Sequence, residues 1–297
     1  MRILVFGGSG MLGHKLVQRL SNEFEVWCTL RSGFDRVERY GIFDRERTIE
    51  NVDVTDISQV RSAIEQALPD VVINAVGLIK QVPAASDVIR VLAVNSVFPR
   101  LLGSLSAQYG FRLITFGTDC VFSGEKGSYV ESDPSDARDL YGISKFLGEV
   151  SEGNCLTLRT SIIGRELETG HSIVEWFLAN RGGSVKGYVN AIYTGFPTVV
   201  MAEIVADIVS KHPDLSGVFH VSSEPISKFD LLNLLNEHFA TGTEITAFEE
   251  YVIDRSLDST RFREVTGFVP QTWDQMLGQM AADPTPYENW NQSASAI

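Results

Sequence analysis

The sequence predicts an α/β protein, a doubly wound parallel sheet with a smaller C-terminal α/β subdomain. Short apolar runs alternate with amphipathic stretches through the first half of the chain. A glycine-rich segment follows the first run, and the alternation fades after "CLTLRTSIIG". Strands that alternate with helical patterns indicate a parallel sheet covered on both faces. Ligands of such sheets bind at the carboxyl ends of the strands, which is where we expect the functional site.

The expected elements follow one another as pairs of strand and helix. The strand "RILVFG" precedes the helix "GHKLVQRLSN", and "EVWCTL" forms the next strand. The helix "VRSAIEQAL" then leads to the strand "DVVINAVG", and "VNSVFPRLLGSLSAQYG" leads to "RLITFGTD". These pairs predict a dinucleotide-binding domain over residues 1–164.

The second half of the chain is less regular. "HSIVEWFLANRGG", "KGYVNAIYTGFPT" and "TEITAFEEYVIDRSLDSTRF" indicate a substrate-binding subdomain, whereas "TVVMAEIVADIVSKH" and "GVFHVSS" indicate a further helix and strand. We therefore expect the subdomain at 165–194 and 223–282, with the chain at about 195–222 completing the large domain. Residues 283–297 have little apolar periodicity and are expected to form a mobile tail.

Composition excludes several classes of function. The formal net charge of -13 and the lack of a basic stripe argue against a nucleic-acid partner. Cys28, Cys120 and Cys155 are too widely spaced for a disulfide framework or a zinc site, so no metal is expected. The first apolar run is too short for a signal peptide, and we find no stretch of the roughly 18 to 20 apolar residues that crosses a bilayer. These features predict a cytoplasmic protein with no membrane partner.

The segment "RILVFGGSGMLGHKL" places three glycines between the first strand and the first helix. Glycine permits a tight turn, close approach of the backbone to a pyrophosphate, and close packing of helix on strand. The helix N-terminus adds amide donors and a positive dipole end. This arrangement predicts a Rossmann-type dinucleotide site with contacts from Gly7, Ser9, Gly10, Met11, Leu12 and Gly13.

The loop after the second strand bears on the choice of cofactor. An enzyme that uses NAD(H) usually places an acid there, but this sequence reads "CTLRSG". Arg31 could bind the 2'-phosphate of NADP(H), which makes NADP(H) the preferred cofactor and NAD(H) the alternative; a solvated loop arginine is the structural interpretation. Further cofactor contacts are expected from the strand-end segments that contain Asp53, Val54, Asn74, Ala75, Val76 and Gly77.

In "DLYGISKFLGE", Tyr141 and Lys145 are four residues apart and would share one face of a helix. An unperturbed tyrosine has a pKa of about 10, and a neighbouring cation brings that pKa closer to working pH by favouring the phenolate. Such a pair suits general acid or base catalysis. Taken alone, the spacing equally describes a surface tyrosine beside a lysine.

Six motifs together resemble the extended short-chain dehydrogenase/reductase family: "GGSGMLG", "NAVG", "GTDCVFSG", "YGISK", "LRTSIIG" and "DRSLDSTRF". Within it the chain is most similar to the dTDP-4-dehydrorhamnose reductases and related nucleotide-sugar reductases, over almost all of residues 1–280. The resemblance implies reduction, by NAD(P)H, of the 4-keto group of a nucleotide-activated 6-deoxyhexose in surface polysaccharide or deoxysugar biosynthesis. It makes Tyr141 the general acid, Lys145 the group that holds the nicotinamide ribose, and Thr118 the hydroxyl that binds the substrate oxygen.

The sequence departs from the reductase pattern where the sugar would be recognised. Gly117 replaces the usual serine before the threonine, Ile162 replaces a tryptophan, and the loop "GYVNAIYTGFPT" is longer. The identity of the hexose is therefore left open. Candidate substrate contacts are Asp119, Cys120, Arg159, His171, Asn190 and Arg255, and Lys80 is a further candidate in the same region; structural or solvated roles are the alternative for these side chains.

Other functions of the family are alternatives to reduction. Dehydratases place Asp and then Glu after the threonine, but here Cys120 follows Asp119, which disfavours 4,6-dehydration. Cys120 and His171 instead resemble the acid and base of GDP-fucose synthase, an epimerase-reductase. A non-catalytic dinucleotide-binding regulatory subunit is a third alternative, disfavoured because Thr118, Tyr141 and Lys145 are all present. The sequence leaves both a monomer and a homodimer open.

Overall fold

The computed structural model describes residues 1–80 and 83–291. The chain divides into two compact units, of which the first comprises residues 1–118, 138–159 and 202–219. The second comprises 119–137, 160–201 and the chain from 220 onward. Segment 119–137, expected in the dinucleotide-binding domain, falls instead in the second unit. It does so because Tyr129 donates its backbone N–H to Ser256 O, at 2.9 Å, and forms a parallel bridge with Leu257.

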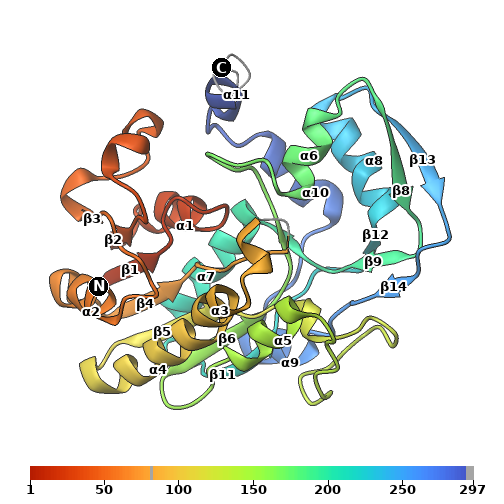
Figure 1. Ribbon diagram of the computed structural model, residues 1–297. Coiled ribbons are helices and arrows are strands. Elements are labelled where there is room, and N and C mark those ends of the chain that lie inside the picture. Colours follow the sequence, from red (N-terminus) through yellow and green to blue (C-terminus); the bar gives the residue numbers. More distant parts are fainter. Residues whose placement is uncertain (81–82, 292–297) are drawn as a thin grey trace. The chain divides into compact units, whose positions relative to one another are not determined.

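The first unit contains a seven-stranded sheet with the order β11-β6-β5-β4-β1-β2-β3 (Figure 1). Strands β1 to β6 pair in parallel. Because β2 lies on one side of β1 and β4 on the other, the strand order reverses between β1 and β4, which is where sheets of this kind bind ligands. The strands are β1 Arg2–Phe6, β2 Glu25–Thr29, β3 Thr48–Ile49, β4 Val71–Asn74, β5 Arg112–Phe116, β6 Cys155–Arg159 and β11 Gly217–His220.

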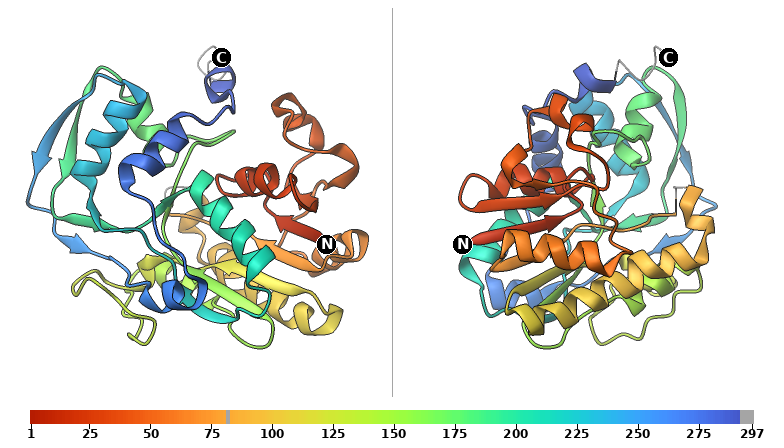
Figure 2. Two further views of the ribbon diagram at one scale, coloured as in Figure 1. Left: turned by 180° about the vertical axis from the view of Figure 1, so that it is seen from behind. Right: turned by 60° about the vertical axis from the view of Figure 1, so that its left-hand side comes forward.

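Helices cover both faces of this sheet (Figure 2). On one face, α2 and α4 bury apolar side chains against Leu4 of β1 and Leu113 of β5. On the other, Arg19 Nε of α1 pairs with Glu203 Oε2 of α7 at 2.6 Å. The helices associated with this sheet are α1 Gly13–Leu20, α2 Ile57–Ala67, α3 Val88–Leu92, the π-helix η5 Ala93–Val97, α4 Phe98–Tyr109, α5 Leu140–Leu147 and α7 Thr198–Lys211. Short 3-10 turns lie at η1 Phe34–Arg36, η2 Glu38–Tyr40, η3 Arg45–Arg47 and η4 Pro83–Ser86.

One continuous helical stretch, Val88–Tyr109, is long and apolar enough to cross a membrane, with a mean hydropathy of 1.4. The expectation that no stretch would reach this length was therefore wrong. Phe98, Leu102 and Leu105 of the stretch are buried in the core beneath the sheet, and 44% of its most apolar window is buried. Its apolar composition is thus explained by packing within the first unit.

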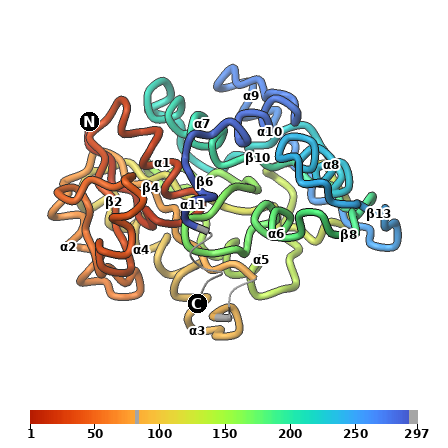
Figure 3. Tube along the Cα trace, turned by 90° about the horizontal axis from the view of Figure 1, so that it is seen from above, coloured from red at the N-terminus to blue at the C-terminus, as the bar shows by residue number. Residues whose placement is uncertain are grey.

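The second unit is built from small sheets and short helices. Its strands are β7 Ile162–Ile163 with β10 Phe196–Pro197, β12 Ile226–Ser227 with β9 Ala191–Tyr193 and β14 Ile253–Asp254, and β13 Glu244–Phe248 with β8 Ser184–Tyr188. Helix α8, Lys228–Phe239, packs closely on β8 (Figure 3). The close approach is clear at Gly187 of β8, where an added Cβ would lie 2.7 Å from the Phe229 ring. The remaining helical segments are η6 Asp119–Val121, α6 Ile173–Ala179, α9 Thr260–Thr266, α10 Trp273–Ala281 and α11 Tyr287–Asn291.

The end of the chain differs from the expected mobile tail. Residues 287–291 form α11, and Tyr287 is buried with its ring 4.8 Å from the guanidinium carbon of Arg165. Arg165 also pairs with Glu288, at 3.1 Å. Two aromatic residues in a five-residue helix are too few for a periodic signal, so the packing was not visible in the sequence. Residues 292–297, the rest of the expected tail, lie outside the described residues.

Candidate active site

The glycine loop joins β1 to α1 and is as tightly packed as a dinucleotide cradle requires. Gly7 has a φ of +85°, a conformation that side chains disfavour. A Cβ added at Gly13 would lie only 1.9 Å from the carbonyl oxygen of Gly7, and Gly10 donates its N–H to that oxygen at 3.0 Å. Both positions therefore require glycine for the loop to keep this shape.

The first turn of α1 is open to an anion. Leu12 at its N-cap makes no side-chain capping bond, and no acidic residue lies in the first turn. An uncapped N-terminus leaves backbone N–H groups and the positive end of the helix dipole for a ligand. The residues present therefore fit the pyrophosphate of a dinucleotide, and the contacts expected from Ser9, Met11 and Leu12 stay predictions.

The residues expected around the adenosine lie near one another. Arg31 is exposed, and its positive charge contributes to lowering the pKa of Asp53. The largest cause of that lowered pKa is hydrogen bonding from Thr55, whose N–H and hydroxyl both donate to Asp53 Oδ1, at 2.9 and 2.8 Å. The Asp53 carboxylate therefore stabilises the turn at residues 53–55. Val54, within this turn, is half-buried.

The segment after β4 runs from the glycine loop towards α5. Asn74 accepts a hydrogen bond from Val76 N–H at 3.0 Å, and Ala75 donates its N–H to Phe6 O. A Cβ added at Gly7 would lie 2.9 Å from Val76 Cγ2, and one added at Gly77 would lie 4.0 Å from Lys145 Nζ. The strand-end segments expected to contact the cofactor are thus adjacent.

Asn95 is a site residue that the sequence analysis missed. It lies in the π-helix η5 and is 2% exposed. Its Oδ1 accepts from Leu78 N–H at 2.8 Å, while its Nδ2 donates to Leu78 O at 3.0 Å and to Ser144 Oγ at 3.1 Å. Asn95 therefore joins the segment after β4 to α5. The available signal was a polar Asn-Ser pair within an apolar run.

The Tyr-x-x-x-Lys pair lies on α5, which Asp139 begins by accepting a hydrogen bond from Gly142 N–H at 2.9 Å. Lys145 Nζ donates to the carbonyl oxygen of Phe116, the last residue of β5, at 2.6 Å. Thr118, two residues farther along the chain, is buried. The ammonium is thus fixed beside the strand end that carries the threonine.

The environment of Lys145 perturbs its ionisation. Burial lowers the pKa of Lys145 to about 8, and the negative charge of Glu149 opposes this shift. A lysine that titrates near 8 can be charged at neutral pH and still respond to nearby groups. Perturbed pKa values of this kind are a feature of functional sites.

Arg159, a candidate substrate contact for which a structural role was the alternative, makes a structural contact. Its guanidinium forms a buried ion pair with Glu149, with Nε to Oε1 at 2.7 Å and Nη2 to Oε2 at 2.8 Å. The Arg159 and Glu149 side chains are 6% and 8% exposed. Arg159 is therefore held within the first unit by a structural pair.

The remaining candidate substrate residues lie in the second unit. Asp119 is buried, and Cys120 Sγ accepts a hydrogen bond from Arg255 Nη1 at 3.7 Å. Arg255 Nε also donates to Phe122 O at 2.8 Å. These contacts bring Cys120 and Arg255 together as neighbours, which their separation in sequence did not indicate.

His171 and Asn190 occupy other parts of that unit. His171 is exposed before α6, and its backbone N–H donates to Glu166 Oε2 at 2.7 Å. Asn190 Nδ2 donates to Glu249 O at 2.9 Å, which ties the turn before β9 to the segment after β13. In the same unit, burial and the charge of Asp119 raise the pKa of the Tyr193 phenol well above 10.

One family model matches almost the whole sequence of this chain. The model described as RmlD substrate binding domain matches residues 1–285. The chain belongs to this family.

Relatives and solved structures of known name agree with that assignment. A Streptomyces antibioticus protein named "Probable dTDP-4,6-dihydroxy-2-methyloxan-3-one 4-ketoreductase" is 32% identical over 75% of this chain and 72% of its own length. The dTDP-4-dehydrorhamnose reductase of Burkholderia thailandensis is 31% identical over 54% of this chain and 50% of its own. The Bacillus anthracis dTDP-4-dehydrorhamnose reductase, solved with NADP, shares the fold at 20% identity, with a TM-score of 0.78 over 95% of this chain and 99% of its own.

Two further matches bear on the alternatives. The Bordetella bronchiseptica enzyme WbmG, solved with NAD, has a TM-score of 0.75 at 20% identity over 95% of this chain and 93% of its own. Methionine adenosyltransferase 2 subunit beta of Danio rerio is 24% identical over 82% of this chain and 77% of its own length. Solved structures that share this fold thus contain NADP in one case and NAD in another.

The packing around Gly117 explains one departure of this RmlD-type chain from the reductase pattern. A Cβ added at Gly117 would lie 2.9 Å from Arg159 Cγ and 3.3 Å from Glu149 Oε1. The buried ion pair therefore occupies the space that a serine side chain at this position would need. Glycine precedes Thr118 here because Arg159 and Glu149 pack against that position.

Proposed function

We propose that this protein is an NAD(P)H-dependent reductase of the 4-keto group of a nucleotide-activated 6-deoxyhexose, acting in surface polysaccharide or deoxysugar biosynthesis. The observation that carries the proposal is the row of contacts at the carboxyl ends of β1, β4 and β5. Gly7 approaches Val76, Gly77 approaches Lys145, and Lys145 donates to Phe116 O two residues before Thr118. This row supports a dinucleotide cradle that lies beside the tyrosine-lysine helix. The names of the relatives supply the substrate class.

The dinucleotide would lie along this row. The loop of Gly7, Gly10 and Gly13 and the start of α1 would hold the pyrophosphate, and Lys145 would hold the nicotinamide ribose. When bound, the reduced nicotinamide supplies the hydride. The residues of the chain orient the cofactor and the sugar and manage the proton.

Tyr141 is the general acid in this proposal. Reduction of a ketone turns the carbonyl oxygen into an alkoxide, which needs a proton and a hydrogen-bond donor as charge develops. Tyr141 gives its phenolic proton to that oxygen, and the Thr118 hydroxyl donates a hydrogen bond to it. The charged ammonium of Lys145 stabilises the resulting tyrosinate, because an opposite charge nearby favours an ionised phenol.

Arg31 supports a preference for NADP(H). It is exposed on the loop after β2 near Asp53, where an adenosine 2'-phosphate would need a cation. The change Arg31→Ala should weaken NADPH binding about tenfold or more and leave NADH binding nearly unchanged, measured by quenching of tryptophan fluorescence. Equal weakening for both cofactors would assign Arg31 a structural role and leave NAD(H) as the natural cofactor.

The direct test is turnover. The protein is mixed with NADPH or NADH and with dTDP-, UDP- or GDP-linked 4-keto-6-deoxy sugars, and loss of the reduced nicotinamide absorbance is followed. Oxidation with one sugar that is lost in Tyr141→Phe supports the reductase. Tight cofactor binding without oxidation on any of these sugars contradicts it.

One alternative follows from a relative. Methionine adenosyltransferase 2 subunit beta is named as a subunit, so this likeness keeps a non-catalytic, dinucleotide-binding regulatory subunit as an alternative for this chain. The simultaneous presence of Thr118, Tyr141 and Lys145 favours catalysis for this chain. Isolation of a stoichiometric partner, together with no cofactor oxidation, would support the regulatory role.

The epimerase-reductase alternative rests on Cys120 and His171. A thiol can exchange a proton at a carbon beside a ketone, and Cys120 lies next to the guanidinium of Arg255. The variant Cys120→Ser decides between a reductase and an epimerase-reductase that uses Cys120. If solvent deuterium still enters the sugar carbons in this variant, Cys120 is not the acid or base.

A further inference from the structure

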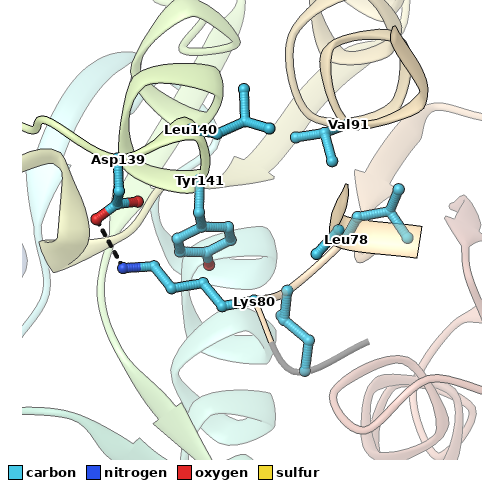
Figure 4. A pocket seen from close by; sticks show the side chains of 8 residues that line it. Leu78, Lys80, Val91, Asp139, Leu140 and Tyr141 are labelled. Carbon is cyan, nitrogen blue, oxygen red and sulfur yellow. Dashed lines mark hydrogen bonds and ion pairs between the residues drawn. The ribbon is translucent and has the colours of Figure 1, made fainter. Parts of the chain in front are cut away.

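A small pocket in the first unit contains a second lysine close to Tyr141 (Figure 4). The pocket has a volume of about 200 Å³. Most of its lining is apolar, from Leu78, Ile79, Ala85, Val91 and Leu140, and the polar members are Lys80, Asp139 and Tyr141. Lys80 comes from the segment after β4, whereas Asp139 and Tyr141 come from the start of α5. Two elements that are distant in sequence therefore meet at the phenol.

Asp139 uses its two carboxylate oxygens for two different purposes. Oδ1 accepts the N–H of Gly142 at 2.9 Å and so begins α5. Oδ2 accepts a hydrogen bond from Lys80 Nζ at 2.7 Å. Because the carboxylate is fixed at the helix start, the ammonium it holds is fixed as well. Lys80 Nζ lies 5.6 Å from the centroid of the Tyr141 ring, which is within cation–π range.

We infer that Lys80, anchored by Asp139, is a positioning residue that favours the ionised form of Tyr141 and so supplements Lys145 in the proposed reduction. This inference rests on the proposed function for its purpose and on the pocket geometry for its physical content. Lys80 and Asp139 are the charged residues that line the pocket beside Tyr141, and Lys145 lies one turn farther along α5. Lys80 thus adds a cation at the ring of Tyr141, besides the lysine on the same helix.

The size of the expected shift in the Tyr141 ionisation depends on how exposed Lys80 and Asp139 are. The side chains of Lys80 and Asp139 are 41% and 43% exposed, so water screens much of their field. At a separation of about 6 Å in a water-like dielectric, one unit charge shifts a neighbouring ionisation by about half a pH unit. Removing Lys80 also removes the positive charge that pairs with Asp139, which acts in the same direction. Both changes make the phenol harder to ionise.

The test is a titration that requires no substrate. Tyrosinate absorbance is recorded against pH for the parent protein and for Tyr141→Phe, and the difference between the two curves isolates the midpoint of Tyr141. The same difference is then taken between Lys80→Met and the double variant Lys80→Met with Tyr141→Phe. We expect the midpoint to rise by about half a pH unit or more in the Lys80→Met background and to stay near the parent value in Lys80→Arg.

A matched control exists in the second unit. Lys126 Nζ lies 5.5 Å from the Tyr129 centroid and pairs with Asp133, so Lys126→Met removes the same kind of contact from another tyrosine. This control should leave the Tyr141 midpoint unchanged. An unchanged midpoint in Lys80→Met, an equal shift in Lys126→Met, or a Tyr141 that titrates no lower than the other tyrosines would each overturn the inference.

The outcomes also separate this inference from the proposed function. A protein that oxidises NADPH with a keto sugar but shows no shift in Lys80→Met keeps its function and loses the inference. A protein that shows the shift but turns over none of the sugars keeps the electrostatic pair and loses the proposed function. In an active protein, the pH profile of kcat is an additional measurement. If its alkaline limb reports the ionisation of Tyr141, that limb should move to higher pH in Lys80→Met.

Discussion

The guanidinium of Arg159 and the carboxylate of Glu149 meet in a buried two-bonded ion pair, 2.7 and 2.8 Å long, packed against Gly117. Glu149 is also the charge that keeps the pKa of Lys145 from falling further. This pair therefore supports the strand end before Thr118 and the helix that carries Lys145. It connects the packing of the core with the electrostatics of the candidate site.

Breaking the ion pair between Arg159 and Glu149 should lower the free energy of unfolding. Arg159→Met leaves the Glu149 carboxylate buried without its partner, which costs about 3 to 5 kcal/mol in the free energy of unfolding. Urea denaturation at pH 7 measures the change. The control is Arg100→Met, which breaks an exposed pair with Glu152 at 3.5 Å and should cost about 1 kcal/mol or less. Equal losses in the two variants would contradict a structural role for Arg159.

Lys145 should contribute to function at the expense of stability. Because burial lowers its pKa from 10.5 to about 8, the folded protein holds an unfavourable charge below pH 8. Between about pH 8 and 10.5 the unfolded chain binds more protons than the folded one, so this unfavourable contribution falls as pH rises through that window. Lys145→Met should therefore gain on the order of 1 to 2 kcal/mol in unfolding free energy at pH 7 while losing activity.

The same variant supplies its own check on the sign. The stability gain of Lys145→Met should shrink between pH 8 and pH 10.5, as measured by urea denaturation at several pH values. Lys211→Met, which removes an exposed lysine paired with Asp207, is the control and should show little pH dependence in this range. A loss of stability in Lys145→Met that is constant with pH would show that the Phe116 hydrogen bond outweighs desolvation.

Gly13→Ala should disable the dinucleotide cradle. The added Cβ would lie 1.9 Å from Gly7 O, so the loop must move away from its present shape. We expect NADPH binding to weaken by about tenfold or more, measured by tryptophan quenching. Gly33→Ala is the control, because Gly33 has a φ of -64° and its nearest neighbour would be 3.7 Å away. Unaltered binding in Gly13→Ala would place the cofactor elsewhere.

Asn95→Asp should loosen the segment after β4. The new side chain keeps an acceptor for Leu78 N–H but loses the donors to Leu78 O and Ser144 Oγ, and it buries a charge. The expected cost is roughly 2 to 3 kcal/mol in unfolding free energy, together with a lower kcat. Asn233→Asp serves as the control, because Asn233 is bonded to Phe229 O in an exposed part of α8. A fully stable and active Asn95→Asp would contradict the positioning role.

Much of the first unit could be predicted from local patterns. The glycine string and the alternation of apolar runs are periodic signals that span only a few residues, and the fold contains the strand-helix pairs they predicted. The spacing of Tyr141 and Lys145 likewise needs only the pitch of one helix, and both residues lie in α5. The expected domain limits were less accurate, because segment 119–137 pairs with residues near 256 that lie far along the chain.

The sequence by itself thus determined the doubly wound class, the glycine loop, the tyrosine-lysine helix and the resemblance that led to the reductase family. Only the tertiary structure decided that Arg159 pairs with Glu149, that Asn95 joins Leu78 to Ser144, and that Lys80 reaches the ring of Tyr141. The physical reason is that buried ion pairs and hydrogen bonds depend on which segments a sheet brings together. That information is contained in long-range packing, whereas helical spacing and glycine turns are written in neighbouring residues.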